Sequence, residues 1–344
     1  MQSELIPGNL LEAFGISREA IISPIGSGHI HQTFLVKENA NWVLQRVNKN
    51  VFTRPEIIAR NNRLAADYLA SKHPGYLFPT PVKSVMGQEM IYAPDGFPWR
   101  VYPLIENTTT IDYVTTSTQA FEAARGFGLL GKNLEGIDCS LFEPTLERFH
   151  DLGWRYEQFE FELEHASTST KAQVAEEVEL AIYFKPLVME FEELIKSNAL
   201  KLRITHNDTK INNILFDRVS GKAVCVIDLD TLMPGYFIFD LGDMVRTCVS
   251  PVSEEEQDVS KIIFRKEIYD ALLAGYLGEM SDTMSVRERA AVPFAGKMMT
   301  YIMALRFLAD FLRGNTYYHI RYPDQNKVRA RNQLYLLKIL SQSV

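Results

Sequence analysis

The chain has 344 residues, of which 46% are hydrophobic and 23% charged, and its formal net charge is −7. These values are typical of a soluble globular protein large enough for two lobes, and the acidic balance argues against a nucleic acid as partner. The three cysteines, Cys139, Cys225 and Cys248, lack the spacing of metal ligands, so we expect reduced thiols in a cytoplasmic protein. The first residues contain neither the basic nor the apolar segment of a signal peptide. We also expect a monomer.

The first elements predict two strands, residues 21–25 and 30–36, around a turn that contains Gly26, Ser27, Gly28 and His29. Glycines let a backbone come close to a ligand, and successive amide groups can face phosphate oxygens. The same pattern also occurs in plain hairpins. We expect this turn to bind the phosphates of a nucleotide.

A third strand is expected at residues 41–47, where a kinase usually places a lysine that pairs with the nucleotide phosphates. This chain offers Gln45 and Arg46 instead, and alternation puts them on opposite faces of the strand. The sequence does not decide which face meets the ligand. The next helix, from Pro55 to about residue 70, carries Glu56, which either pairs with Arg46 or favours the helix N-terminus.

A strand near residues 99–105 runs into a threonine-rich connector, and we place the lobe boundary there. Residues 1–104 form the predicted nucleotide-binding lobe, and residues 105–344 the predicted catalytic and acceptor-binding lobe. In the connector, the backbone of Leu104 and Ile105 is expected to meet adenine, because ligands favour domain interfaces. Beyond it, apolar periodicity predicts a mainly helical lobe, with helices at 121–134, 174–197, 259–277 and 286–312.

Residues 291–311 are the most apolar late stretch, but Lys297, Arg306 and Asp310 interrupt them. A membrane span rarely contains three such charges, so we expect a buried helix and no membrane partner.

The central motif is His206-x-Asp208-x-Lys210-x-x-Asn213, and Asp228 follows Asn213 after fifteen positions, beyond a predicted hairpin of residues 214–216 and 223–227. A carboxylate that receives a proton, an amide and a carboxylate that hold Mg²⁺, and a lysine that neutralises phosphate oxygens are what phosphoryl transfer requires. We therefore expect Asp208 and Lys210 to be catalytic, Asn213 and Asp228 to bind Mg²⁺, and His206 to support the loop. A polar turn between buried strands would not need four matched groups in this order.

Three further carboxylates follow the motif. Asp230 could reach a second Mg²⁺ or hydrogen-bond the turn at residues 231–235. Asp240 and Asp243 precede an apolar segment, and each could cap the helix that follows.

The set His206, Asp208, Asn213 and Asp228 resembles the aminoglycoside phosphotransferase and choline kinase superfamily. With segments 25–30, 205–210, 227–235 and 306–310, the chain resembles the N-acetylhexosamine 1-kinases over nearly its whole length. The resemblance implies an α+β, two-lobed, protein-kinase-like fold with a small β-rich first lobe and a larger, mainly helical second lobe. It also implies ATP- and Mg²⁺-dependent phosphorylation of the anomeric hydroxyl of N-acetylglucosamine or N-acetylgalactosamine. The absence of the third-strand lysine is a departure from the wider kinase pattern.

The side chains expected to contact the sugar are those of His31, Asp208, Asp243, Arg306 and Tyr317. Alternatively, Arg306 forms a salt bridge between helices and Tyr317 lies in the core. Two other functions remain open: a kinase of the same fold that acts on an aminoglycoside, choline or homoserine, or a non-catalytic nucleotide-binding module. A cationic acceptor would need a strongly acidic pocket, for which the sequence offers little beyond Asp240 and Asp243. The complete Asp208, Asn213 and Asp228 set argues against the non-catalytic module.

Overall fold

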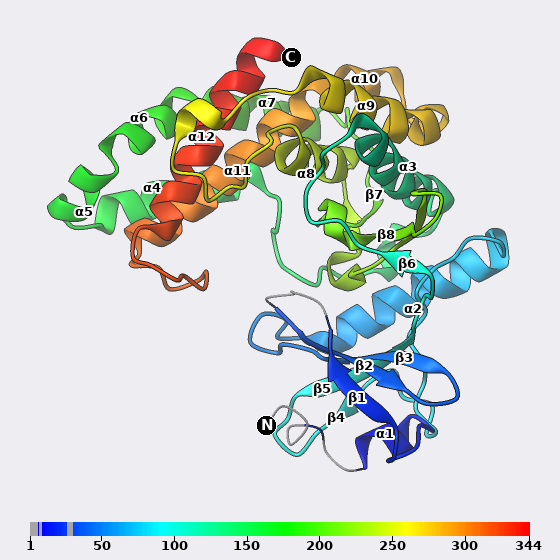
Figure 1. Cartoon of the computed structure of the whole chain (residues 1–344). Helices are drawn as coiled ribbons and strands as arrows, with labels where there is room; N and C mark the ends of the chain where they lie inside the picture. Colours follow the sequence, from blue (N-terminus) through cyan, green and yellow to red (C-terminus); the bar gives the residue numbers. More distant parts are fainter. Residues whose placement is uncertain (1–5, 7–8, 26–29) are drawn as a thin grey trace.

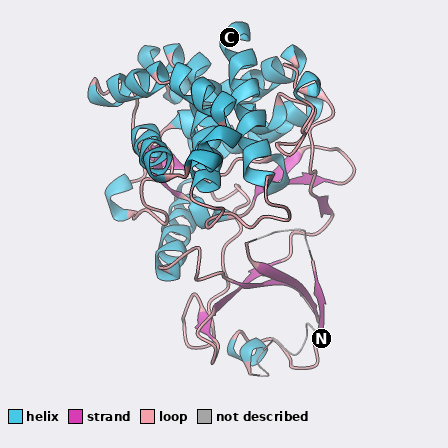
Figure 2. Ribbon diagram, turned by 90° about the vertical axis from the view of Figure 1, so that its left-hand side faces the viewer, coloured by secondary structure: helices cyan, strands magenta, loops and turns pink. Residues whose placement is uncertain are grey.

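The computed structural model describes residues 6, 9–25 and 30–344, and in it the chain forms two lobes (Figure 1). The smaller lobe contains the first strands, and the larger lobe is mostly helical (Figure 2). The predicted phosphate-binding turn, Gly26, Ser27, Gly28 and His29, lies outside the described residues, so its role stays a prediction.

The first lobe is built on a five-stranded antiparallel sheet of order β1-β2-β3-β5-β4, preceded by the short helix α1 (Leu10–Ala13). The strands are β1 (Ile21–Pro24), β2 (Gln32–Lys37), β3 (Asn41–Arg46), β4 (Ile91–Tyr92) and β5 (Pro98–Pro103). Alternation separates two faces: Phe34, Leu44 and Val101 are buried in one core cluster with residues of α1. The opposite face, which carries Gln45 and Arg100, is therefore directed away from α1.

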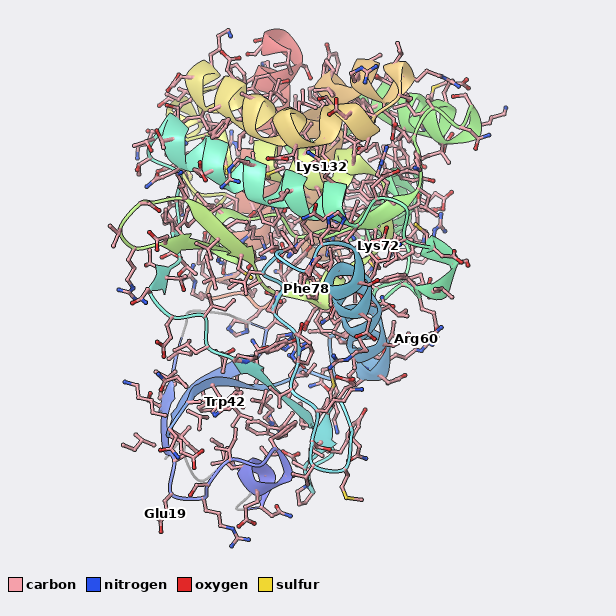
Figure 3. All side chains as sticks on the ribbon, turned by 90° about the vertical axis from the view of Figure 1, so that its right-hand side faces the viewer. Glu19, Trp42, Arg60, Lys72, Phe78 and Lys132 are labelled. Carbon is pink, nitrogen blue, oxygen red and sulfur yellow. The ribbon has the colours of Figure 1, made fainter. Side chains whose placement is uncertain are left out.

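Helix α2 (Pro55–Lys72) lies between the sheet and the second lobe, as Figure 3 shows with Arg60 and Lys72 labelled on it. Pro55 stands in its first turn, where the missing N–H costs no hydrogen bond. Ile58 packs into a first-lobe cluster, whereas Leu69 belongs to the large core of the second lobe. The helix therefore connects the two lobes.

In the second lobe, helix α11 (Val292–Leu312) is buried along almost its whole length and packs against several other helices. The helices of this lobe are α3 (Ser117–Asn133), α4 (Leu152–His165), α5 (Thr168–Gln173), α6 (Ala175–Tyr183), α7 (Pro186–Lys196), α8 (Phe237–Cys248), α9 (Lys266–Met280), α10 (Val286–Ala290), α11 (Val292–Leu312) and α12 (Gln325–Ser343). Gly242 of α8 and Gly296 of α11 let these two helices approach closely, because a Cβ at either position would collide with the facing helix. This close contact fixes the position of α8 relative to α11.

Two small antiparallel sheets carry the central motif. One has the order β6-β8-β9 and consists of β6 (Thr108–Thr109), β8 (Ile214–Asp217) and β9 (Ala223–Val226). The other pairs β7 (Arg203–Thr205) with β10 (Met233–Gly235). Short 3₁₀ turns occur at Cys139–Leu141, Ile211–Asn213, Leu229–Thr231, Val259–Lys261 and Ser281–Thr283. The lobe boundary predicted after residue 104 falls between β5 and β6.

Several predicted boundaries were wrong. The helix predicted at 174–197 is two helices, α6 and α7, because Pro186 starts a new one. The helix predicted at 286–312 likewise divides into α10 and α11 near Pro293, and α9 begins only at Lys266. Helices α4 and α5 were not predicted.

The apolar stretch at 291–311 is a buried helix, as predicted. Within the part of the chain that the structure describes, no helix has the length and apolar character needed to cross a membrane. The three cysteines are free thiols, and Cys225 and Cys248 are buried.

Candidate active site

The loop between β7 and β8 begins with His206, whose fully buried side chain stabilises the loop. Its Nδ1 accepts a hydrogen bond from the backbone N–H of Asp208 at 3.2 Å, so its Nε2 carries the proton and donates to the carbonyl of Ile227 at 2.9 Å. The ring of Phe127 packs edge-on against the imidazole at 5.2 Å. Both ring nitrogens are thus used to fix the loop.

Asp240 supports the same loop from helix α8. Its Oδ1 accepts the N–H of Asn207 at 2.7 Å and its Oδ2 the N–H of His206 at 3.0 Å. Burial raises the pKa of Asp240 to about 6, although the His206 ring and the two amide bonds favour the charged form. The capping role expected for Asp240 was wrong: α8 begins earlier, after Tyr236, and the carboxylate binds loop amides instead.

The structure brings Asp208, Lys210 and Asn213 together, as the motif predicts. Asp208 Oδ1 lies 2.8 Å from Lys210 Nζ, and Asn213 Nδ2 donates to Asp208 Oδ2 at 3.1 Å. Burial opposes the charged form of Asp208, but the ion pair with Lys210 outweighs it and lowers the pKa of Asp208. The same pair raises the pKa of Lys210. An ionised carboxylate beside an ammonium group is therefore the resting state of this loop.

Asp228 lies next to this group in a left-handed backbone conformation, with φ of 59°. Among the described residues, no hydrogen bond or ion pair engages its carboxylate, which is exposed to solvent. Desolvation by the surrounding protein raises the pKa of Asp228, and the charges of Asp230 and Asp208 act in the same direction. Such an open carboxylate beside other acids is suited to a cation.

Asn213 offers a second oxygen for the same cation. Its Nδ2 donates to the backbone carbonyl and to the carboxylate of Asp208, whereas its Oδ1 has no hydrogen-bond partner among the described residues. The backbone carbonyl of Asn213 accepts the N–H of Ile227 at 2.9 Å and so ties this residue to the segment before Asp228. Hard oxygen donors of this kind are the ligands that Mg²⁺ prefers, so these residues fit a magnesium site.

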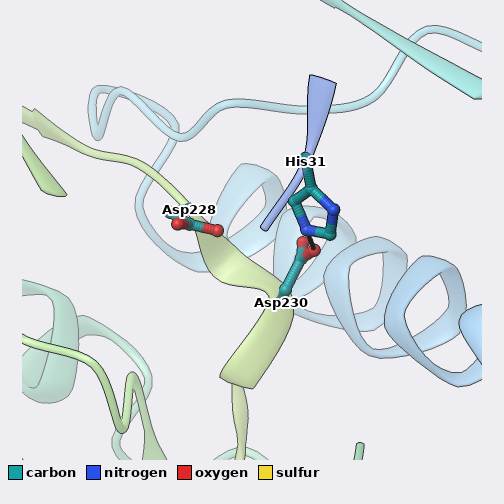
Figure 4. A group of neighbouring side chains, drawn as sticks. All are labelled: His31, Asp228 and Asp230. Carbon is teal, nitrogen blue, oxygen red and sulfur yellow. Dashed lines mark hydrogen bonds and ion pairs between the residues drawn. The ribbon is translucent and has the colours of Figure 1, made fainter. Parts of the chain in front are cut away.

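The Asp230 carboxylate does not hydrogen-bond the described turn at residues 231–235, and its suggested contact with a second Mg²⁺ stays a prediction. Its Oδ2 lies 2.5 Å from His31 Nε2, and its Oδ1 lies 2.5 Å from Arg100 Nη1. Figure 4 shows the His31 and Asp230 side chains pointing toward one another. The other ring nitrogen of His31 accepts the N–H of Asn48 at 3.0 Å, so Nε2 is the donor. Ligand atoms of His31, Asp228 and Asp230 lie within 4.8 Å of one another, but only Asp228 is without a partner among the described residues. Both oxygens of Asp230 therefore contact the first lobe.

The face of β3 that meets the second lobe is the face of Gln45. Its Oε1 accepts hydrogen bonds from Nε and Nη2 of Arg100 at 3.0 and 2.9 Å. Arg46 lies on the other face, where it pairs with Asp95 at 2.8 Å and stacks on Phe97. The suggested pair of Glu56 with Arg46 does not form, since the Glu56 carboxylate lies 3.8 Å from Arg54.

Sequence reasoning missed Arg100. The signal was present: a single arginine between Trp99 and Val101 in an apolar strand, directly opposite Gln45 in the register of β3 and β5. A charge in such a strand is expected to be paired.

Asp243, which the sequence predicts to contact the sugar, is buried and paired with Arg246, whose Nη2 lies 2.7 Å from Asp243 Oδ1. Its other oxygen has no hydrogen-bond partner among the described residues. The charge of Asp243 also adds to the effect of Asp208 in raising the pKa of Lys210. Asp243 thus acts electrostatically on the Lys210 ammonium group.

Arg306 and Tyr317 lie together, and the structure supports neither the salt bridge between helices considered for Arg306 nor the core position considered for Tyr317. Arg306 forms no ion pair with any described residue; its guanidinium lies over the rings of Phe149, Tyr317 and Tyr318 at 4.9, 5.9 and 5.6 Å. Tyr317 is 58% exposed rather than part of the core. The hydroxyl of Tyr318 is buried without a hydrogen-bond partner among the described residues.

His150 lies against the loop that carries Asp208, and sequence reasoning did not select it. Its Nε2 donates to the carbonyl of Asn207 at 2.9 Å. Burial lowers the pKa of His150 to about 3, and the charges of Arg306 and Arg155 act in the same direction. Burial also lowers the pKa of Arg155 to about 10, with a further contribution from Arg306. Arg155 donates to the carbonyl of Phe149 and Arg306 lies over the ring of the same residue, so the two guanidinium groups lie near one another.

In the connector between the lobes, Leu104 and Ile105 each use one backbone group in a hydrogen bond within the protein. The N–H of Leu104 donates to the carbonyl of Asn41 at 3.0 Å, and the carbonyl of Ile105 accepts the hydroxyl of Thr108 at 2.7 Å. The Leu104 carbonyl and the Ile105 N–H have no partner among the described residues.

Comparison with known proteins agrees with this geometry. Solved structures that share the fold include a microcompartment-associated aminopropanol kinase, which is 16% identical with a TM-score of 0.64 and covers 96% of this chain and 94% of its own. The amicoumacin kinase hAmiN, in complex with AMP-PNP, Ca²⁺ and Ami, is 16% identical with a TM-score of 0.59, over 94% of this chain and 92% of its own. Spectinomycin phosphotransferase, in complex with ADP and spectinomycin, is 13% identical with a TM-score of 0.59, over 94% and 93%.

These likenesses confirm the predicted two-lobed, kinase-like fold. Residues 21–288 also match the model of the phosphotransferase enzyme family, and this range includes Asp208, Asn213 and Asp228. The chain therefore belongs to the phosphotransferase enzyme family and is an enzyme that transfers a phosphoryl group to a hydroxyl group.

Proposed function

We propose that this phosphotransferase uses ATP and Mg²⁺ to phosphorylate the anomeric hydroxyl of an N-acetylhexosamine and so makes the sugar 1-phosphate. The family match and the shared fold support a small-molecule kinase, and the choice of acceptor rests on the arrangement around Arg306.

In this proposal, ATP lies between the lobes. The Leu104 carbonyl and the Ile105 N–H contact the adenine edge, since they have no partner among the described residues. Gln45 belongs to the sheet face that meets the second lobe, and the turn of Gly26, Ser27, Gly28 and His29 covers the phosphates.

Mg²⁺ is held by Asn213 Oδ1 and the carboxylate of Asp228. When bound, the ion neutralises negative charge on the phosphate oxygens. Lys210 adds a positive charge from the opposite side of Asp208, to which it is already paired.

Asp208 orients the acceptor hydroxyl and takes its proton late in the transfer. Its lowered pKa keeps it ionised near neutral pH, as a base requires. The anomeric hydroxyl is more acidic than other sugar hydroxyls, so a weakly basic carboxylate is sufficient for it.

The observation that carries the choice of acceptor is the guanidinium of Arg306, which has aromatic neighbours and no carboxylate partner among the described residues. An ammonium-bearing acceptor requires free carboxylates. Asp240 is bound to loop amides, and one oxygen of Asp243 is bound to Arg246. Guanidinium donors instead suit neutral oxygens, such as a sugar hydroxyl or an acetamido carbonyl.

His31, Asp243 and Tyr317 complete the proposed acceptor contacts. Tyr317 is exposed and presents an aromatic ring near Arg306, which suits the apolar face of a sugar. Asp243 retains one oxygen without a partner among the described residues. His31 would have to exchange its contact with Asp230 for a sugar hydroxyl.

The experiment is a panel of acceptors with ATP and Mg²⁺, monitored by release of ADP. N-acetylglucosamine and N-acetylgalactosamine are expected to give turnover far above that of glucose, kanamycin, choline or homoserine. Preferred turnover of kanamycin or choline would contradict the acceptor assignment and leave the phosphotransferase activity intact.

A further inference from the structure

In protein kinases, a lysine on the third strand pairs with a glutamate on the following helix, and this pair must form for activity. Neither partner is present here. The corresponding strand β3 carries Gln45, and the Glu56 side chain of α2 is 63% exposed beside Arg54. Other residues must therefore connect the first-lobe sheet to the site where the nucleotide phosphates are proposed to bind.

Arg100 occupies the position from which the link can be made. It lies on β5 directly opposite Gln45, and its guanidinium is only 2% exposed. Nε and Nη2 are bound to Gln45, and Nη1 reaches Asp230, which is 3% exposed and lies two residues after Asp228. The planar guanidinium of Arg100 thus joins strands β3 and β5 of the first lobe to residues 228–230 of the second lobe, the proposed metal-binding segment.

Helix α2 does not supply the acidic partner. The side chain that it buries beside Tyr102 is the neutral amide of Asn62, which is fully buried. Tyr102 lies on the same face of β5 as Arg100, whose guanidinium is 5.2 Å from its ring. The acid that neutralises Arg100 therefore comes from the second lobe.

We propose that Arg100 is a positioning residue for the metal-binding segment: through Asp230 it fixes Asp228 relative to the first-lobe sheet, the task of the lysine and glutamate pair in protein kinases. With a fractional exposure of 2%, Arg100 is not open to the nucleotide and acts through Asp228. The proposal does not depend on the identity of the acceptor.

The test uses the whole chain with Arg100→Gln, which removes the charge and keeps a polar side chain. Calorimetry measures the dissociation constant of ADP with Mg²⁺ and, separately, with EDTA. The variant is expected to bind ADP at least 10-fold more weakly with Mg²⁺, and within about 3-fold of the wild type with EDTA. An acceptor KM close to that of the wild type is expected at saturating ATP. Equal losses with and without Mg²⁺, or no loss, would overturn the proposal.

The matched control is Arg46→Gln, one residue from Gln45 on the same strand. Its guanidinium pairs with Asp95 on the opposite face, so ADP binding with Mg²⁺ is expected to be unchanged. A loss equal to that of Arg100→Gln would mean that any break in the sheet has this effect, and would contradict the proposal.

Arg100→Gln leaves a buried carboxylate without its cation, and this variant could unfold. The double variant Arg100→Gln/Asp230→Asn removes both charges, so it keeps the fold while it lacks the link. It is expected to show the same Mg²⁺-dependent loss, and wild-type binding by this folded protein would overturn the proposal.

A rescue follows from the register of β3 and β5. In Gln45→Lys/Arg100→Gln the cation moves to the neighbouring strand and still faces Asp230. This variant is expected to recover at least part of the Mg²⁺-dependent ADP affinity lost in Arg100→Gln. No recovery in a folded protein would show that a cation on this face is not what the segment requires.

Discussion

Asp208 Oδ1 lies 2.8 Å from Lys210 Nζ, while the other oxygen of the same carboxylate accepts the amide of Asn213 at 3.1 Å. One carboxylate therefore contacts both the cation that would face the phosphate and the amide that would hold the metal. This relationship places the proposed base between the two charges that stabilise the transferred group.

Replacing this base should separate binding from chemistry. Asp208→Asn keeps the shape and a hydrogen-bonding group, but it removes the oxygen that takes the proton. We expect KM for the acceptor to change little and kcat to fall by roughly 10²-fold or more. Steady-state kinetics measures both, and unaltered kcat would remove Asp208 from the chemistry.

Asp228→Ala should abolish turnover without unfolding the protein. The side chain makes no hydrogen bond to described residues, and its charge is disfavoured by Asp230 and Asp208, so the fold does not depend on it. In thermal unfolding, ADP with Mg²⁺ should raise the Tm of the wild type, whereas the variant should gain little from adding Mg²⁺ to ADP. Near-normal activity of the folded variant would refute the metal assignment.

Arg306→Ala tests the acceptor contact. With donors to sugar oxygens lost, the KM for the N-acetylhexosamine should rise by about 10-fold or more, and the KM for ATP should stay within about 2-fold. Arg313→Ala, at the end of the same helix, is the control, because its guanidinium pairs with Glu162 at the surface. An unchanged acceptor KM in Arg306→Ala would place this arginine outside the acceptor site.

His150 should make stability depend on pH. Its folded pKa of about 3 is far below the ordinary 6.5, so the unfolded chain binds the proton more readily. The stabilising contribution is therefore complete above about pH 6.5 and falls by about 1.4 kcal/mol per pH unit below it. Urea unfolding of the wild type and His150→Gln between pH 7.5 and 5 should show a steeper loss in the wild type. Parallel pH profiles would contradict this assignment.

The sequence predicted the parts of this molecule that depend on local pattern. Strands β1, β2, β3 and β5, the hairpin at 214–226 and the loop with Asp208 and Asn213 follow from alternation, turn residues and motif spacing, whereas β4 was not predicted. These features are short in sequence, so neighbouring residues determine them.

Long-range pairs could not be predicted in the same way. Asp230 meets His31 and Arg100 across the lobes, at separations that no local pattern encodes. Asp240 looked like a helix cap, but only the packing of α8 against α11 shows that it faces the loop amides. The position of Arg306 over Phe149 likewise depends on tertiary packing.

The central claim, that Asp208 directs phosphoryl transfer to the anomeric oxygen of an N-acetylhexosamine, is tested most directly by phosphorus NMR of the wild-type product. With ATP, Mg²⁺ and N-acetylglucosamine or N-acetylgalactosamine, we predict a single sugar 1-phosphate whose phosphorus couples to the anomeric proton, and ADP in equal amount. Phosphate on the primary hydroxyl, or ATP consumed only with an amine-bearing acceptor, would contradict the claim.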